Sequence, residues 1–249
     1  MMAMPTSTRL LITNSEYFKL GNVWIATNGG LMAYNNRIHT FSTYTVANDK
    51  LRSNVCTSLW YGDKGNRMMV GTAEGLDIIS IATGEVTHLT GNSTSLQPFT
   101  NRYVTQVMED SRGIIWVGTR EGVNILNLDN DELSYITEKD GLCNNSICGI
   151  AEDKNHSIWV TTSNGISRVV VQRNHEDGTF NYGLYNYDIN DGLQSNEFNM
   201  GAILRKNNGS VVFGGLYGIN TIRQNSKETQ ESLPRVMLTQ LFIGEEEIL

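Results

Sequence analysis

The chain has 249 residues, 39% of them hydrophobic, and a formal net charge of −7. An acidic chain lacks the Lys/Arg-rich surface that nucleic acids and anionic membranes require, so we expect this segment to bind neither. No apolar run approaches the roughly 20 residues that span a bilayer, so we expect no membrane insertion by this segment.

Five related segments follow one another along the chain. They are NVWIATNGGLMAY, RMMVGTAEGLDII, IIWVGTREGVNIL, SIWVTTSNGISRV and SVVFGGLYGINTI. Their spacing of about 43–53 residues is close to the period of a propeller blade. Each places a large apolar residue six positions before a glycine. These repeated anchors are Trp24, Met69, Trp116, Trp159 and Val212, followed by Gly30, Gly75, Gly122, Gly165 and Gly218.

Each unit is predicted to form four short antiparallel strands. In the third unit they are YVTQVMED, IIWVGT, VNILNL and LSYIT, separated by the turns SRG, REG and DNDE. No sustained 3.6-residue pattern is present, which excludes a helical solenoid. We therefore expect an all-β chain, a partial or open β-propeller of about five blade units made of four-stranded antiparallel blades.

The repeated anchors have a structural explanation. Large apolar side chains fill the space between twisted neighbouring blades, so we expect the tryptophans to pack in the core. We do not expect them to bind a cofactor or stack on a sugar. The glycines fit a tight turn that needs a positive φ.

The repeats predict three regions. Residues 1–22 form a partial blade edge whose only strand-like run is RLLIT, and they lack a signal-peptide pattern. Residues 23–225 form the propeller blades. Residues 226–249 contain SKETQESLP, a polar stretch typical of a linker, and then a new apolar pattern. An arc of five units leaves sheet edges unpaired, so we expect the chain to be part of a larger protein or to form a homodimer.

Two motifs resemble a known family. The run D-x-x-G-x-I-W-V-G-T-x-x-G at Asp110–Gly122 and the DGLxxN crossovers at Asp140–Asn145 and Asp191–Asn196 are similar to two-component regulator propeller repeats. The resemblance covers about residues 20–225. Residues 226–249 are similar to the linker and first strand of the Ig-like sandwich that follows such propellers, here truncated.

This resemblance implies a function. The segment would be the extracytoplasmic, periplasmic sensor of a hybrid two-component regulator, binding oligosaccharide to control polysaccharide-utilisation genes. Its partners would be the oligosaccharide and the remaining propeller blades and Ig-like domain of the full-length sensor. The histidine kinase of the family would lie outside this chain, so the segment itself is not expected to be an enzyme.

Other functions stay open at this point. The chain could be a scaffold or protein-interaction propeller, or a propeller carbohydrate-active enzyme or lyase. No serine elbow, P-loop or dinucleotide fingerprint appears, and we expect no cofactor. The turn DSRGIIW is similar to an Asp-box, which is a structural turn rather than a catalytic motif.

The histidines and cysteines do not predict a metal site or a disulfide framework. His39, His88, His156 and His175 are isolated along the sequence and show no ligand spacing. Cys56, Cys143 and Cys148 are expected to be small packing residues, with a bridge between the last two as the alternative.

One face of the propeller is the expected ligand site. The turns between second and third strands and the crossovers between fourth and first strands emerge there together. Asn, Arg and Glu pair with sugar hydroxyls, tyrosine stacks on sugar rings, and arginine would bind an acidic sugar. The predicted ligand-binding residues are Arg52, Asn54, Asn101, Arg102, Tyr103, Arg120, Asn145, Asn196, Glu197 and Tyr217.

Overall fold

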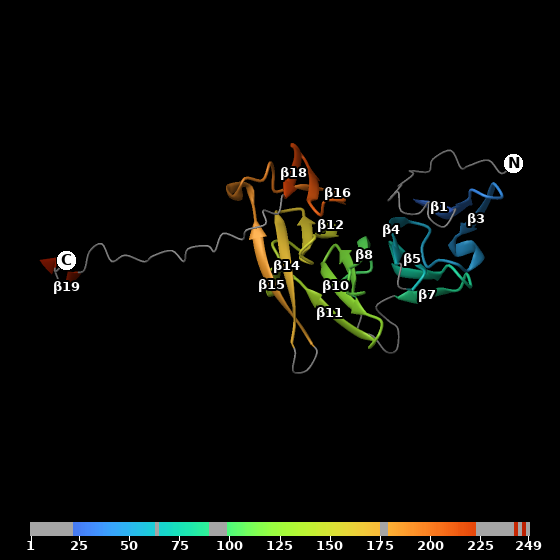
Figure 1. Cartoon of the computed structure of the whole chain (residues 1–249), viewed down its shortest axis with the longest axis horizontal. Helices are drawn as coiled ribbons and strands as arrows, with labels where there is room; N and C mark the ends of the chain where they lie inside the picture. The colour runs from blue at the N-terminus through green and yellow to red at the C-terminus, as the bar shows by residue number, and fades with distance from the viewer. Residues whose placement is uncertain are drawn as a thin grey trace.

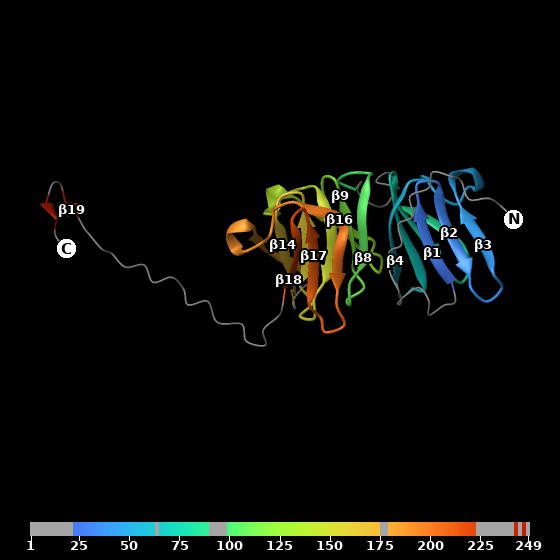
Figure 2. The same cartoon turned by 90° about the horizontal axis from the view of Figure 1, so that it is seen from above.

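A computed structural model describes residues 22–62, 65–89, 99–174 and 179–222, together with strand residues 242–243 and 246–247. The described chain is all-β, which confirms the predicted fold class. Five antiparallel sheets follow one another along an arc (Figures 1 and 2). The helical segments among the described residues are three-residue 3-10 turns, and none is long enough to cross a membrane.

The five sheets, called blades 1 to 5, are meanders in which each strand pairs with the next along the chain. Blade 1 has three strands, blades 2, 3 and 4 have four each, and blade 5 has three. The bounds in blades 1 and 2 are β1 (Asn22–Thr27), β2 (Gly30–Asn35), β3 (Thr40–Tyr44), β4 (Cys56–Gly62), β5 (Arg67–Thr72), β6 (Gly75–Ser80) and β7 (Val86–Leu89).

Blades 3, 4 and 5 repeat the same plan. Their bounds are β8 (Val104–Glu109), β9 (Ile115–Thr119), β10 (Gly122–Asn127), β11 (Glu132–Ile136), β12 (Ile147–Glu152), β13 (Ile158–Thr162), β14 (Ile166–Arg173), β15 (Phe180–Tyr187), β16 (Phe198–Arg205), β17 (Val211–Gly215) and β18 (Gly218–Ile222). Separately, β19 (Phe242–Ile243) pairs with β20 (Glu246–Glu247). Three crossovers contain the 3-10 turns η2 (Val46–Asn48), η3 (Glu138–Asp140) and η4 (Ile189–Asp191).

The first strands of the blades form the inner side of the arc. β4 contacts β8, β8 contacts β12, and β12 contacts β16, as expected for strands grouped around one axis. Figure 2 shows β16, β8 and β4 side by side. By repeat position β1 is a second strand, and the run RLLIT predicted to precede it lies outside the described residues. The linker predicted after the blades also lies outside them.

Apolar clusters between successive blades form the core. Trp24 packs between blades 1 and 2, Met69 between blades 2 and 3, Trp116 between blades 3 and 4, and Trp159 between blades 4 and 5. All four are buried, whereas Val212 at the same repeat position in blade 5 is only half-buried. A large side chain at this position therefore fills the interface with the following blade.

The repeated glycines take the backbone conformation that the turn requires. Gly122 has φ +117°, and a Cβ there would lie 2.8 Å from the backbone oxygen of Ile136 on β11. The other four anchor glycines also have positive φ. Only glycine combines this dihedral with so close an approach of the neighbouring strand.

The outer face of blade 5 is apolar and uncovered among the described residues. Leu204 and Ile219 are 57% and 72% exposed. Their repeat equivalents in blade 4, Ala151 and Ile166, are 7% and 0% exposed beneath blade 5. This face therefore has the composition of an internal blade interface.

Replacing Trp116 by alanine should lower the free energy of unfolding by about 3–5 kcal/mol, because the cavity would lie between two blades. The matched change Val212→Ala, at the same repeat position without a covering blade, should cost about 1 kcal/mol or less. Chemical denaturation followed by tryptophan fluorescence and circular dichroism measures both. Equal losses would show that the anchor position does not act through the interface.

The exposed face of blade 5 should cause self-association of this chain, because equivalent faces elsewhere are buried against another sheet. Ile219→Glu should shift the sedimentation velocity profile towards monomer. Tyr135→Glu, which adds the same charge at another exposed position on β11, should not. A monodisperse monomer of the unmodified chain would contradict this expectation.

Candidate ligand-binding face

The turns between second and third strands lie on the same face as the crossovers between blades. The backbone N–H of Gly122 donates to the backbone oxygen of Asn145 (2.8 Å), and that of Gly165 donates to the backbone oxygen of Asn196 (2.7 Å). The turns of blades 3 and 4 are thus tied to the crossovers that lead into the next blade. We call this continuous surface the crossover face.

A threonine shapes the tip of each of these turns in blades 1 to 4. In blade 3 the Thr119 hydroxyl donates to the Gly122 oxygen (2.9 Å) and accepts from the Glu121 backbone N–H (3.1 Å). Thr27, Thr72 and Thr162 donate in the same way to Gly30, Gly75 and Gly165. The hydroxyl closes the turn from inside, so the tip residues, such as Arg120, remain exposed.

Three of the asparagines predicted to bind a ligand support the crossovers. The side-chain oxygens of Asn54, Asn145 and Asn196 accept from the first backbone N–H of η2, η3 and η4, at distances of 2.8, 2.8 and 2.9 Å. Each amide oxygen therefore satisfies a donor at the start of a short helical turn. This structural role differs from the sugar contact expected from the sequence and leaves only the amide NH2 facing away from the cap.

A second set of supports comes from the third strands and was missed by the sequence analysis. A polar side chain two residues after each anchor glycine in blades 2 to 5 accepts a crossover backbone N–H from Arg52, Thr100, Cys143 or Gln194. The acceptors are Asp77, Asn124, Ser167 and Asn220. The signal in the sequence is a polar residue two positions after the anchor glycine, within an apolar strand pattern, in GLD, GVN, GIS and GIN.

Arg102 breaks the repeated pattern. It occupies the repeat position of Asn54, Asn145 and Asn196, but arginine cannot accept a hydrogen bond. Its guanidinium reaches Glu74 of the preceding turn at 3.7 Å, with the two side chains 67% and 53% exposed. The structure therefore presents at this position a cation directed outward instead of a cap.

Tyr103 and Arg120 lie beside Arg102 on this face. The Arg120 guanidinium carbon sits 3.9 Å above the centre of the Tyr103 ring, a cation–π contact between the crossover into blade 3 and the turn of blade 3. Asn101 fixes this crossover by accepting the Tyr103 backbone N–H at 2.8 Å. The predicted residues that come together are thus Asn101, Arg102, Tyr103 and Arg120, with Glu74 added by the structure.

The other predicted residues lie on the same face but at other blades. Arg52 is exposed on the crossover into blade 2. Glu197 is exposed on the crossover into blade 5, where its backbone oxygen accepts from Leu216. Tyr217 is 78% exposed, and its backbone N–H donates to the side chain of Gln194. No contact joins these three to the group around Arg102 in the described part of the chain.

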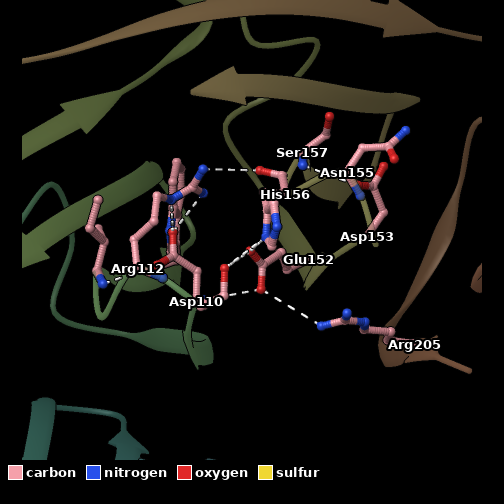
Figure 3. Close-up of polar contacts among 11 residues, drawn as sticks. Asp110, Arg112, Glu152, Asp153, Asn155, His156, Ser157 and Arg205 are labelled. Atoms are coloured by element: carbon pink, nitrogen blue, oxygen red, sulfur yellow. Dashed lines mark hydrogen bonds and ion pairs between the residues drawn. The ribbon is translucent and has the colours of Figure 1, made fainter. Parts of the chain in front are cut away.

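The opposite face carries a polar network between blades 3, 4 and 5. Glu152, at the end of β12, accepts from the Ser111 backbone N–H at 3.0 Å and lies 3.7 Å from the Arg205 guanidinium. Figure 3 shows Glu152 between His156 and Arg205. An ion pair between Arg67 and Glu109, at 3.0 Å, joins blades 2 and 3 in a similar way. These contacts link adjacent blades.

A serine, a histidine and a glutamate, Ser111, His156 and Glu152, meet in this network, but they do not form a catalytic triad. The serine hydroxyl (2.8 Å) and the glutamate (2.9 Å) both contact the same histidine nitrogen, Nδ1. In a serine hydrolase the carboxylate and the nucleophile bond opposite ring nitrogens, so that the histidine can pass a proton between substrate and serine. The network therefore serves to connect the blades.

The Asp-box-like turn of blade 3 is structural, as its resemblance suggested. Asp110 accepts from the backbone N–H groups of Arg112 (2.9 Å) and Ile114 (3.1 Å) and from the indole N–H of Trp116 (2.9 Å). In blade 4 Asp153 binds Trp159 in the same way, at 2.8 Å. The buried indoles thus obtain the acceptor they need.

The described histidines each contact another side chain, although the sequence places no potential metal ligands at regular spacing beside them. His88 Nδ1 lies 2.7 Å from Asp77, its register partner across β6 and β7, and His39 contacts Tyr34. His175 lies outside the described residues. The described part of the chain contains no group of three or more metal-ligating side chains.

The three cysteines are free, so Cys143 and Cys148 form no bridge. Burial raises the pKa of the Cys56 thiol to about 12 and that of Cys148 to about 11. Neither thiol forms a thiolate near neutral pH, so these two are unsuited to nucleophilic chemistry.

A cavity of about 180 Å³ lies between blades 1 and 2, away from the crossover face. Its lining includes Trp24, Ile38 and Ile79, and no charged side chain contributes to it. Two of its walls are the turns between third and fourth strands, which point to the opposite face. The cavity thus offers polar but uncharged side chains, such as those of Asn35 and Ser42, and no arginine.

Comparisons with known proteins follow the repeat. The two-component regulator propeller family model matches residues 98–121 and 141–164. These segments hold a crossover, the first two strands and the following turn of blades 3 and 4. Two segments of the chain thus match two-component regulator propeller repeats, and both contain motifs from which the sequence resemblance was inferred. A histidine kinase, P4, from Formosa agariphila is 28% identical over 111 residues, which is 45% of this chain and 8% of that protein.

Solved structures share the fold. The extracellular domain of a hybrid two-component system from B. thetaiotaomicron matches with a TM-score of 0.76 and 22% identity, over 97% of this chain and 32% of that one. A second such domain from the same organism matches with a TM-score of 0.67 and 22% identity, over 89% of this chain and 28% of that one. Virginiamycin B lyase from Staphylococcus aureus matches with a TM-score of 0.54 and 14% identity, over 86% of this chain and 68% of that one. The chain thus spans about a third of the two-component domains.

Asn145→Ala should destabilise the protein by about 1 kcal/mol, because the first N–H of η3 would lose its cap. Arg102→Ala, at the same repeat position, should change stability by less than about 0.5 kcal/mol, because an exposed ion pair contributes little. Urea denaturation of the two variants and the unmodified chain measures this difference. A larger loss for Arg102→Ala would mean that the arginine braces its crossover.

Proposed function

We propose that this chain, in which two segments match two-component regulator propeller repeats, is the extracytoplasmic ligand-sensing segment of a hybrid two-component regulator. It binds an oligosaccharide on the crossover face, and binding controls genes for polysaccharide use. Its compartment is the periplasm. The observation that carries the proposal is the group formed by Arg102, Tyr103 and Arg120, which presents hydrogen-bond donors and an aromatic ring on braced loops.

The chemistry of this group suits a sugar. Sugar hydroxyls exchange hydrogen bonds with water for bonds to guanidinium, amide and carboxylate groups, and a sugar ring offers an apolar face to an aromatic side chain. Because the loops are held by internal hydrogen bonds, little backbone entropy is lost on binding. The solved two-component domains that share the fold support an extracellular sensor.

The site also offers a route for a signal. Glu74 belongs to the turn of blade 2, Arg102 to the crossover, and Arg120 to the turn of blade 3. A ligand that contacts all three bridges two blades and favours one spacing between them. A change in that spacing is transmitted to neighbouring blades through the apolar interfaces, which fit in only a few arrangements.

Two other functions remain as alternatives. The fold is shared with a lyase, so an enzyme is one of them, but a glycosidase needs a pair of carboxylates set across one pocket. On the crossover face Glu74 and Glu121 stand at turn tips, Glu197 stands on a crossover, and Glu74 pairs with an arginine. A protein-docking scaffold is the other, for which the exposed face of blade 5 gives some support.

Arg102→Ala and Tyr103→Ala should each weaken sugar binding by about 1–3 kcal/mol. The first removes charge-assisted hydrogen bonds and the second removes stacking. Isothermal titration calorimetry against a panel of plant and algal oligosaccharides measures the affinities, after thermal melts have shown both variants to be folded. Arg37→Ala, at an exposed turn on the opposite face, serves as the control and should bind normally.

Three outcomes separate the proposals. Binding that both face substitutions reduce supports a sensor. Turnover of the sugar by purified protein would identify an enzyme instead. No binding to any oligosaccharide, together with a stable complex with another protein domain, would favour the scaffold.

A further inference from the structure

We propose that the ligand of the crossover face is an anionic oligosaccharide, whose carboxylate or sulfate groups bind Arg102, Arg120 and Arg52. This rests on the sugar-binding function proposed above and names the class of sugar. Three exposed guanidinium groups stand on the turns and crossovers of blades 2 and 3, in a chain whose net charge is −7.

Arg102 is available to an anion at low cost. The same repeat position holds a capping asparagine in the three crossovers that contain helical turns, so arginine here contributes nothing to the cap. Its contact with Glu74 is 3.7 Å long and lies between two mostly exposed side chains. Exposed pairs of this kind are weak, so a ligand anion can displace the glutamate.

Arg120 is also positioned to bind an anion. Its guanidinium stacks on Tyr103 at 3.9 Å, which restricts the side chain and leaves its N–H edges free to point away from the ring. No hydrogen bond joins this guanidinium to an acceptor in the described part of the chain. A stacked guanidinium can form two parallel hydrogen bonds with a carboxylate or sulfate, and little rotamer entropy remains to be lost.

Arg52 adds a third cation beside the same turn of blade 2. Its backbone N–H donates to Asp77 at 3.1 Å, and Asp77 lies three residues after Glu74. The side chain of Arg52 is exposed. The exposed acidic side chains at these tips are Glu74 and Glu121, whereas the Asp77 carboxylate is buried and paired with His88. Asp49 and Lys50, both exposed on the same crossover, offset each other in charge.

The arginines of the crossover face named here lie at blades 2 and 3, and the exposed Lys139 of the crossover into blade 4 stands between Glu138 and Asp140. The repeat positions of Arg52 and Arg102 hold Cys143 and Asn145 at blade 4, and Gln194 and Asn196 at blade 5. Amide side chains at every blade would be sufficient to form hydrogen bonds with a neutral sugar. Arginines at two neighbouring blades therefore point to recognition of charge, and uronate carboxylates and sulfate esters share the anionic oxygens that they would bind.

Calorimetry with the full chain at about 0.15 M salt, where long-range attraction is screened, tests this proposal. The probes are oligogalacturonate, its neutral methyl ester, a sulfated heparin-derived oligosaccharide and a neutral malto-oligosaccharide. We expect one anionic probe to bind at least about tenfold more tightly than the neutral ones, because hydrogen bonds to charged groups are stronger. Preference between the two anionic probes distinguishes carboxylate from sulfate recognition.

Variants connect the preference to the arginines. Arg102→Gln and Arg120→Gln should each weaken binding of the anionic probe by about 10–100-fold, and Arg102→Lys should weaken it less, because lysine keeps the charge without the paired N–H groups. Arg37→Gln removes the same charge from the opposite face and should have no effect. Circular dichroism and melting temperature check that each variant is folded.

The results separate this inference from the function on which it rests. Equal affinity for oligogalacturonate and its methyl ester, or binding of the malto-oligosaccharide alone, would overturn the anionic ligand while leaving a sugar sensor. An equal loss in Arg37→Gln and Arg102→Gln would also overturn it, since attraction would then depend on net charge alone. Failure of all four probes to bind would count against both proposals.

Discussion

Burial of both faces of each internal blade against its neighbours is the constraint on which the rest of the structure depends. A twisted four-stranded sheet with two apolar faces is not stable by itself in water, because each face must be removed from solvent. Trp116, buried between blades 3 and 4, and Trp159, between blades 4 and 5, show how the requirement is met. Small residues contribute where backbones come close: a Cβ at Gly118 would lie 2.6 Å from the side chain of Ile147 on the next blade.

Polar contacts on both faces of the arc act together with apolar packing to fix the orientation of each blade relative to the next. On one side Glu152 holds the Ser111 turn of the preceding blade and approaches Arg205 of the following one. On the other side, the turns of blades 3 and 4 are bonded to the next crossover, as Gly122 is to Asn145. Together with the third-strand acceptors such as Asn124, these bonds hold the loops of the crossover face against the strands beneath them.

The sequence predicted those features that arise from periodicity. The anchor tryptophans and glycines recur at one spacing, and a single interface repeated several times explains them. The roles of individual polar residues were harder to predict, because an asparagine can bind a ligand or its own backbone equally well. The Asn145 amide suits a sugar hydroxyl by its chemistry, but its direction depends on η3, which ends at Asp140 five residues earlier. The pairing of His88 with Asp77 required the strand register, which places residues eleven apart opposite each other.

The position shared by Asn54, Arg102, Asn145 and Asn196 has a consequence for how such a chain can change its ligand. When this residue changes, the crossover is still held by a third-strand side chain such as Asn124 or Ser167, and the loss of a capping asparagine costs only about 1 kcal/mol. A substitution at this position can therefore add or remove a contact with the ligand while the blades remain folded. Each blade of the arc thus offers one position at which ligand specificity can change independently of the other blades.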